Sequence, residues 1–186
     1  AANTIVQLKT TVPYVDKVSN PDPASGGAEA EDLTALLERA PRALRHRHRA
    51  VSIEDYQDLA LLASPEVARA LCVPLHNLAI DPDASSTHPG VVSLIVVPRS
   101  SEAKPSPTLT LLDEVRGYLD ERRIATADLV VVAPEYVRVD VTVEVALVSL
   151  EGAGAVANAV AQALAAFLHP LTGGLDENGW DFGRRP

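Results

Sequence analysis

Three imidazoles and one thiol are the side chains of this sequence that zinc binds most readily. They belong to His46, His48, Cys72 and His76. Structural zinc sites use ligand pairs at short, regular spacings, whereas this set follows no standard pattern and falls on different predicted elements. We therefore interpret His46 and His48 as solvated side chains of an arginine-rich segment, and we expect no metal site.

Nucleophilic catalysis is a second chemistry that the sequence permits, with Cys72 as the attacking group. Cys72 stands between Leu71 and Val73 in a predicted strand, which is typical of a buried structural thiol. Three other motifs lack the partners that their chemistry needs: Asp181-Phe182-Gly183 (kinase), Gly152-Ala153-Gly154 (dinucleotide binding) and Asp81-Pro82-Asp83 (calcium). Because no catalytic constellation emerges, we expect neither an enzyme nor a cofactor.

Basic side chains gather in the segment 39–49, which contains no acid and includes Arg39, Arg42, Arg45, Arg47 and Arg49. The whole chain has 16 Lys and Arg against 25 Asp and Glu, a net charge of −9. A basic segment on an acidic chain favours docking between subunits over phosphate contact with nucleic acid. The residues alone leave three interpretations open: subunit contact, nucleic-acid contact and a solvated linker.

Two aromatic residues, Trp180 and Phe182, stand out in the polar tail 175–186. Such residues anchor a tail either on its own domain or on a partner. Together with four of the arginines they form our set of predicted inter-subunit contacts: Arg42, Arg45, Arg47, Arg49, Trp180 and Phe182.

Composition limits the class of protein. The chain has 186 residues, of which 47% are hydrophobic and 22% charged, as in globular proteins that bury a core. A single cysteine excludes an internal disulfide framework, and no stretch approaches the ~20 apolar residues of a membrane span. The sequence contains no Met and shows no signal peptide, so we expect it to be part of a longer protein.

Hydrophobic periodicity predicts the elements that must position these residues. Helices are expected over 31–38, where Pro41 would end the helix, over 52–63 with Ser52 as its cap, from Ser106-Pro107 onward, and over 153–168. For the third helix we expect an inner face of Leu109, Leu112, Val115 and Leu119. Strands are expected over 4–8, 66–73, 91–97, 128–132 and 137–147, the last from strict alternation of valines with polar residues.

The resulting order is roughly β-α-α-β-β-α-β-β-α, in which helices alternate with pairs of strands. This order favours an α+β fold with small antiparallel or mixed sheets, each covered by helices, and with extended polar straps. We expect three parts. Residues 1–31 would form an extended strap or linker, and residues 32–134 an α+β module. Residues 135–186 would add a strand, a helix and a tail that pack on that module or form a second one.

Several segments resemble the phage baseplate J-like family in their order and spacing. They are Asn20–Glu31 with its Gly26-Gly27 pair, the arginine segment Arg39–Ser52 with Glu54-Asp55-Tyr56, Val96-Val97-Pro98 with the helix Leu111–Arg123, His169–Gly174, and Gly179–Arg184. The resemblance covers about residues 4–185. Within that family, the chain is most similar to baseplate assembly proteins of bacterial contractile injection systems, whose members are longer chains.

The resemblance implies a structural wedge subunit that joins its neighbours in a ring around the hub and relays the trigger for sheath contraction. Its partners would be other wedge and hub subunits and further copies of itself, without nucleic acid or membrane contact. It would assemble in the cytoplasm and then be part of a tail-like particle. The alternatives are an enzyme or metal-binding domain of unknown reaction, and a nucleic-acid-binding module that uses the Arg39–Arg49 segment.

Overall fold

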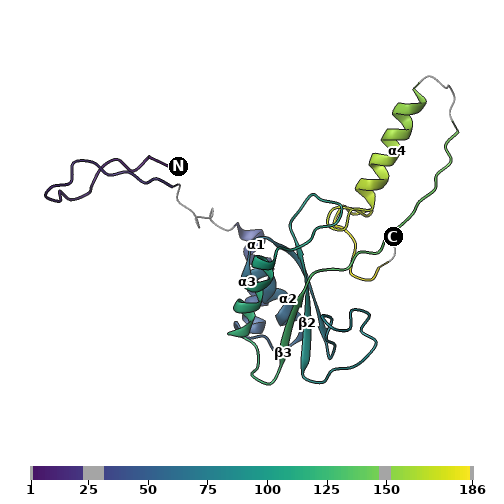
Figure 1. The fold of residues 1–186 in the computed structure, drawn as a ribbon, viewed down its shortest axis with the longest axis horizontal. Coiled ribbons are helices and arrows are strands. Elements are labelled where there is room, and N and C mark those ends of the chain that lie inside the picture. The colour runs from purple at the N-terminus through teal and green to yellow at the C-terminus, as the bar shows by residue number, and fades with distance from the viewer. Residues whose placement is uncertain (1, 23–31, 147–151, 185–186) are drawn as a thin grey trace. The chain divides into compact units, whose positions relative to one another are not determined.

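The computed structural model describes residues 2–22, 32–146 and 152–184. Its elements follow the order α1 (Leu33–His46), α2 (Ile53–Ala63), β1 (Val67–Pro74), β2 (Val91–Pro98), α3 (Leu109–Asp120), β3 (Asp128–Val132) and α4 (Ala153–Phe167) (Figure 1). This is a small α+β fold, as the sequence predicts. The chain divides into two compact units, Ala1–Ala40 and Pro41–Pro186.

A mixed sheet of three strands in the order β1-β2-β3 forms the centre of the second unit. β1 and β2 are antiparallel, with a register shift between Val67 and Arg69, and β2 and β3 are parallel. The central strand β2 is rich in β-branched residues and is bounded by Gly90 and Pro98, which explains why the sequence predicts it so clearly. The parallel pair requires a crossover, which α3 supplies.

Helices α2 and α3 lie side by side on one face of this sheet and enclose the core (Figure 1). The core joins apolar side chains of both helices to those of all three strands; they include Tyr56, Leu59, Val67, Cys72, Leu94, Val96, Leu111, Val115, Leu119 and Val131. The loop 75–90 is hydrogen-bonded to the buried side chain of Ser93, which belongs to β2. The Ser93 hydroxyl donates to the His76 carbonyl at 2.8 Å and accepts from the Leu78 amide at 3.0 Å.

Helix α2 begins as predicted, because Ser52 caps it. The Ser52 hydroxyl accepts from the Asp55 amide, and the Asp55 carboxylate accepts from the Ser52 amide, which completes a capping box. Helix α3 begins later than predicted, because Thr108 rather than Ser106 is its cap. Its buried side chains are Leu111, Val115 and Leu119, whereas Leu109 is 80% exposed.

The prediction that Pro41 ends the first helix is wrong. Pro41 lies inside α1, which continues to His46. A proline in a helix interior removes one backbone hydrogen bond and is unfavourable by about 3 kcal/mol. The last turns of α1 after Pro41 contact α2 through Arg42 and Arg45, and local sequence signals do not reveal these contacts.

Two predicted strands are absent from the described residues. Residues 4–8 form no strand; the Asn20 side chain instead accepts hydrogen bonds from the Thr4 and Ile5 amides at 3.0 and 2.9 Å. Residues 137–146 belong to no sheet, because no other described strand pairs with them, and the predicted end at 147 lies outside the described residues. The turn-rich segment 20–27 is described only as far as residue 22.

Within the described ranges, no helix combines the length and the apolar character that crossing a membrane requires.

Candidate interaction surfaces

Two of the candidate arginines lie on the last turns of α1 and face acids of α2. Arg45 Nη2 lies 2.5 Å from Asp58 Oδ2, and Arg45 Nε lies 3.7 Å from Asp55 Oδ1. Arg42 Nε lies 3.9 Å from Asp58 Oδ1. Both arginines are about half exposed, while the acids are mostly buried. These pairs therefore connect the last turns of α1 to α2 and leave part of each guanidinium accessible to solvent.

Asp55 connects the start of α2 to α1. Burial opposes ionisation of its carboxyl group, but hydrogen bonds from Ser52 and from the Val51 amide favour the charged form, as does the nearby Arg45. The net result is a pKa below the usual range for aspartate. The sequence predicts the cap at Ser52 but not the contact between Asp55 and Arg45.

The other two arginines, Arg47 and Arg49, lie in the turn between α1 and α2. Arg47 and His48 both have positive φ, and the His48 amide donates to Nδ1 of His46 at 2.9 Å. The prediction that His46 is solvated is wrong, because its side chain is buried. Ala50 is fully buried, and its amide donates to the Arg122 carbonyl at the end of α3. The turn is thus held at both ends, while Arg47 and Arg49 are exposed and form no ion pair with a described residue.

The possible zinc ligands are not brought together. Among residues 2–22, 32–146 and 152–184, no three His, Cys, Asp or Glu side chains form a group that could hold a metal ion. Cys72 is buried in the core, as the sequence predicts. Burial raises the pKa of its thiol to about 12, and the charge of Glu54 adds to the effect, so the thiol is protonated at neutral pH.

The aromatic tail residues lie against the end of α4. The Trp180 ring meets the Phe167 ring edge to face at 5.3 Å, and its Nε1 donates to the Phe167 carbonyl at 2.9 Å. Phe182 is half-buried. Trp180 is thus held by contacts within the chain, and part of its surface stays accessible.

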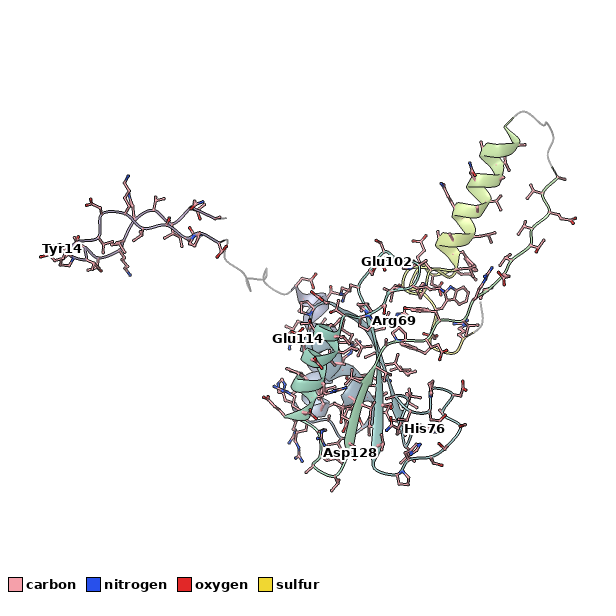
Figure 2. All side chains as sticks on the ribbon, viewed as in Figure 1. Tyr14, Arg69, His76, Glu102, Glu114 and Asp128 are labelled. Carbon is pink, nitrogen blue, oxygen red and sulfur yellow. The ribbon has the colours of Figure 1, made fainter. Side chains whose placement is uncertain are left out.

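Arg69 of β1 holds the tail from the sheet side (Figure 2). Its guanidinium donates to the Trp180 carbonyl at 2.8 Å and to the Asn178 carbonyl. Sequence reasoning missed Arg69, because a single arginine in a strand carries no sign of contacts more than a hundred residues away. The tail turn also requires glycine at position 173, where a Cβ would collide with the Phe167 carbonyl oxygen.

A further surface comprises residues 137–146, called here the valine segment, and α4. The valine segment runs alongside α4 (Figure 1), and an open groove of about 300 Å³ lies between them. Its walls include Val141, Val143 and Val145 on one side and Val156, Val160 and Leu164 on the other. None of the described side chains of α4 is buried. The sequence predicts that this strand and helix pack on the first module or form a second one, whereas among the described residues the valines of the segment are about half exposed or more.

Among solved structures, a chain from the cryo-EM structure of the anti-feeding prophage (AFP) baseplate is similar to this chain, with 24% sequence identity and a TM-score of 0.46. The similarity covers 70% of this chain and 29% of that one, so this chain spans less than a third of the AFP chain.

No curated protein matches this chain. The sequence profile of the family described as "Baseplate protein PVC11-like" matches residues 1–169, which is most of the chain. The expectation of a baseplate protein is thereby confirmed. The chain belongs to the PVC11-like family of baseplate proteins.

Proposed function

We propose that this chain is part of a wedge subunit in the baseplate of a phage-tail-like contractile injection system. It would join neighbouring subunits into a ring around the hub, with other wedge and hub subunits as its partners. The observation that carries the proposal is the match of the PVC11-like baseplate family to residues 1–169. The ordered segments that resemble the baseplate J-like family support the finer assignment to a wedge.

The geometry supports a structural role in two ways. First, the three-stranded sheet and its two covering helices give a well-packed body in which Leu59, Leu94 and Leu119 are fully buried. Second, the valine segment and α4 expose apolar surface, a common mark of surfaces that bind other proteins. A rigid body with exposed surfaces suits a subunit that assembles with others.

The residues proposed for inter-subunit contact are Arg42, Arg45, Arg47, Arg49, Trp180 and Phe182. Arg47 and Arg49 give the sharpest test, because each is exposed and forms no ion pair within the described chain. Arg42 and Arg45 are less suitable, since their replacement would also break the contacts with Asp58. Polar contacts of this kind can rearrange, which suits a baseplate that must change its structure when triggered.

The test is charge reversal in cells that make the particle. The double substitution Arg47→Glu and Arg49→Glu is introduced into the complete protein that these cells produce. It should strongly reduce the number of assembled particles that sediment from the lysate. The matched control is Lys104→Glu with Arg116→Glu, which changes the net charge equally at two other exposed positions. If particles that carry this double variant assemble and contract normally, Arg47 and Arg49 do not form inter-subunit contacts that assembly requires. Particles that assemble normally without the chain at all would refute the baseplate function.

A further inference from the structure

The valine segment is an extended stretch of backbone with no partner among the described residues. Its residues belong to no sheet and make no backbone hydrogen bond with any described residue. Exposed strands of this kind readily pair with another strand, because their amide and carbonyl groups are free to form a ladder. The alternation of valines with polar residues gives the segment one apolar face and one polar face.

The apolar face of the segment is only partly covered. Val139, Val141, Val143 and Val145 are 46–50% exposed, although three of them line the groove beside α4. α4 carries no charged residue and buries none of its described side chains. Exposed apolar surface of this extent is a common mark of a binding surface, and a further strand paired with the valine segment would cover part of it.

The charged residues of the polar face indicate which strand would pair with the segment. It presents Arg138, Asp140, Thr142 and Glu144, with Arg138 at one end and Glu144 at the other. Within the chain, Arg138 Nε lies 2.8 Å from Asp140 Oδ1, and both of these side chains are exposed. We propose that the valine segment pairs antiparallel with the valine segment of a second copy of this chain, centred on Val141. In that register Arg138 of each copy stands opposite Glu144 of the other, and Asp140 stands opposite Thr142.

The same register matches the apolar face. Val137 stands opposite Val145, Val139 opposite Val143, and Val141 opposite itself. Valine pairs across strands are favourable, and opposite charges that face each other add to the stability of the pair. The paired strands then form one ribbon, with every valine on the face that α4 borders.

Other registers place like charges together, or form fewer pairs of valines or of opposite charges. Centring the pair on Val143 puts Thr142 opposite Glu144 and Asp140 opposite Ala146, so no opposite charges meet. Centring the pair on Thr142 puts Asp140 opposite Glu144, and centring it on Asp140 puts that carboxylate opposite its own copy. A parallel pair in register puts every charged residue beside its copy. Centring on Val139 pairs Arg138 with Asp140 but places Glu135 opposite Val143, which breaks the apolar face. Like charges directly opposite destabilise a pair of strands, so the register centred on Val141 is favoured.

This inference deepens the proposed baseplate function, on which it rests for its biological setting, and it can be tested with the purified chain. In an antiparallel pair, directly opposite Cα atoms are about 4.5–5.5 Å apart, within the range that a disulfide can bridge. Val141→Cys should therefore give a disulfide-linked dimer under mild oxidation. Cys72 cannot account for this product, because it is buried in the core.

A matched control uses the neighbouring valine of the same face. Val139→Cys alone should remain unlinked, since two copies of residue 139 would be roughly 13 Å apart along the ribbon. A mixture of the Val139→Cys and Val143→Cys chains should link as a heterodimer. All three positions are about half exposed, so the variants are expected to fold, which circular dichroism checks.

Charge exchange gives a second readout that needs no cysteine. Arg138→Glu or Glu144→Arg should each weaken the dimer about tenfold or more in sedimentation equilibrium, because each change creates two like-charged pairs. The double variant R138E/E144R restores opposite charges and should recover the dimer. A chain that stays monomeric at its highest soluble concentration would overturn the proposal, as would linkage of Val139→Cys alone in place of Val141→Cys.

The two proposals can fail separately. If the chain sediments with tail-like particles but does not link at position 141, the self-pairing is wrong and the baseplate function stands. If the chain links at position 141 but is absent from such particles, the self-pairing stands and the baseplate function is wrong.

Discussion

Asp55 illustrates how one side chain can serve two elements. Its carboxylate completes the capping box of α2 and also lies 3.7 Å from Arg45 of α1. Of the first role, the sequence predicts only that Ser52 caps the helix. It does not predict the second, because the arginine that approaches Asp55 belongs to a helix expected to end at Pro41.

Asp55→Asn should lower the free energy of unfolding by about 1 kcal/mol or more at pH 7, because hydrogen bonds to a charged group are lost. The folded pKa of Asp55 lies below its unfolded value, so this stabilisation is present above about pH 4 and is lost as the pH falls through the folded pKa. Urea unfolding of the variant and wild type from pH 7 to pH 2 measures the difference.

The control for this prediction is Glu54→Gln, an exposed carboxylate on the same turn of α2. It should change the stability by no more than about 0.5 kcal/mol. A constant difference between Asp55→Asn and wild type at every pH would contradict the assignment.

Cys72 should behave as an inert core thiol. Its burial and its pKa of about 12 leave almost no thiolate at neutral pH. An alkylating reagent should therefore modify it at least a hundredfold more slowly in the native protein than in urea, as measured by intact mass. Rapid modification of the native protein would mean that Cys72 is accessible, which would reopen the question of a reactive cysteine.

At the scale of elements, the sequence predicts those that carry their own local signals. The strand over 91–97 and the helix over 52–63 agree with β2 and α2 because their patterns, turn residues and cap are local. The predictions fail where contacts with another element determine the local structure. α1 continues past Pro41 and its last turns contact α2. Residues 137–146 pair with no other described strand, because a strand requires a neighbour that the pattern alone does not supply.

Two leucines of α3, Leu111 and Leu109, test which face of the helix is buried in the core. Leu111 is 3% exposed in the core, whereas Leu109 is 80% exposed. Leu111→Ala should lower the free energy of unfolding by about 2–5 kcal/mol, and Leu109→Ala by less than about 0.5 kcal/mol. Chemical denaturation of both variants measures this, and the reverse ranking would support the inner face that the sequence predicts.

The tail after α4 is held to the sheet by Arg69, so its order should depend on that side chain. Arg69→Ala removes hydrogen bonds to the carbonyls of Asn178 and Trp180. Protease cleavage between residues 175 and 184 should become several-fold faster, while the core unfolds at an unchanged urea concentration. The control is Arg116→Ala on α3, an exposed arginine at which no change is expected. Equal cleavage rates would show that Arg69 does not hold the tail.

At the scale of the whole molecule, the sequence predicts the class of protein better than it predicts the surfaces that contact other subunits. The order of the Gly26-Gly27, arginine and Gly179–Arg184 segments is enough to indicate a baseplate protein, and the family match confirms it. The surfaces that would meet other subunits are harder to predict. Arg42 and Arg45 resemble free basic residues in the sequence, yet they pair with acids of α2. The alternation of the valine segment predicts a strand with one buried face, yet the described valines of that face are about half exposed or more.

The most direct test of the account locates the chain in the particle. High-molecular-weight particles would be sedimented from the lysate of the source cells, and a gold-labelled antibody to this chain would be applied before electron microscopy. We predict that the chain sediments with tube- and sheath-bearing particles and that the gold lies at one end of the tube. A chain that remains in the supernatant while such particles sediment without it would contradict the baseplate function.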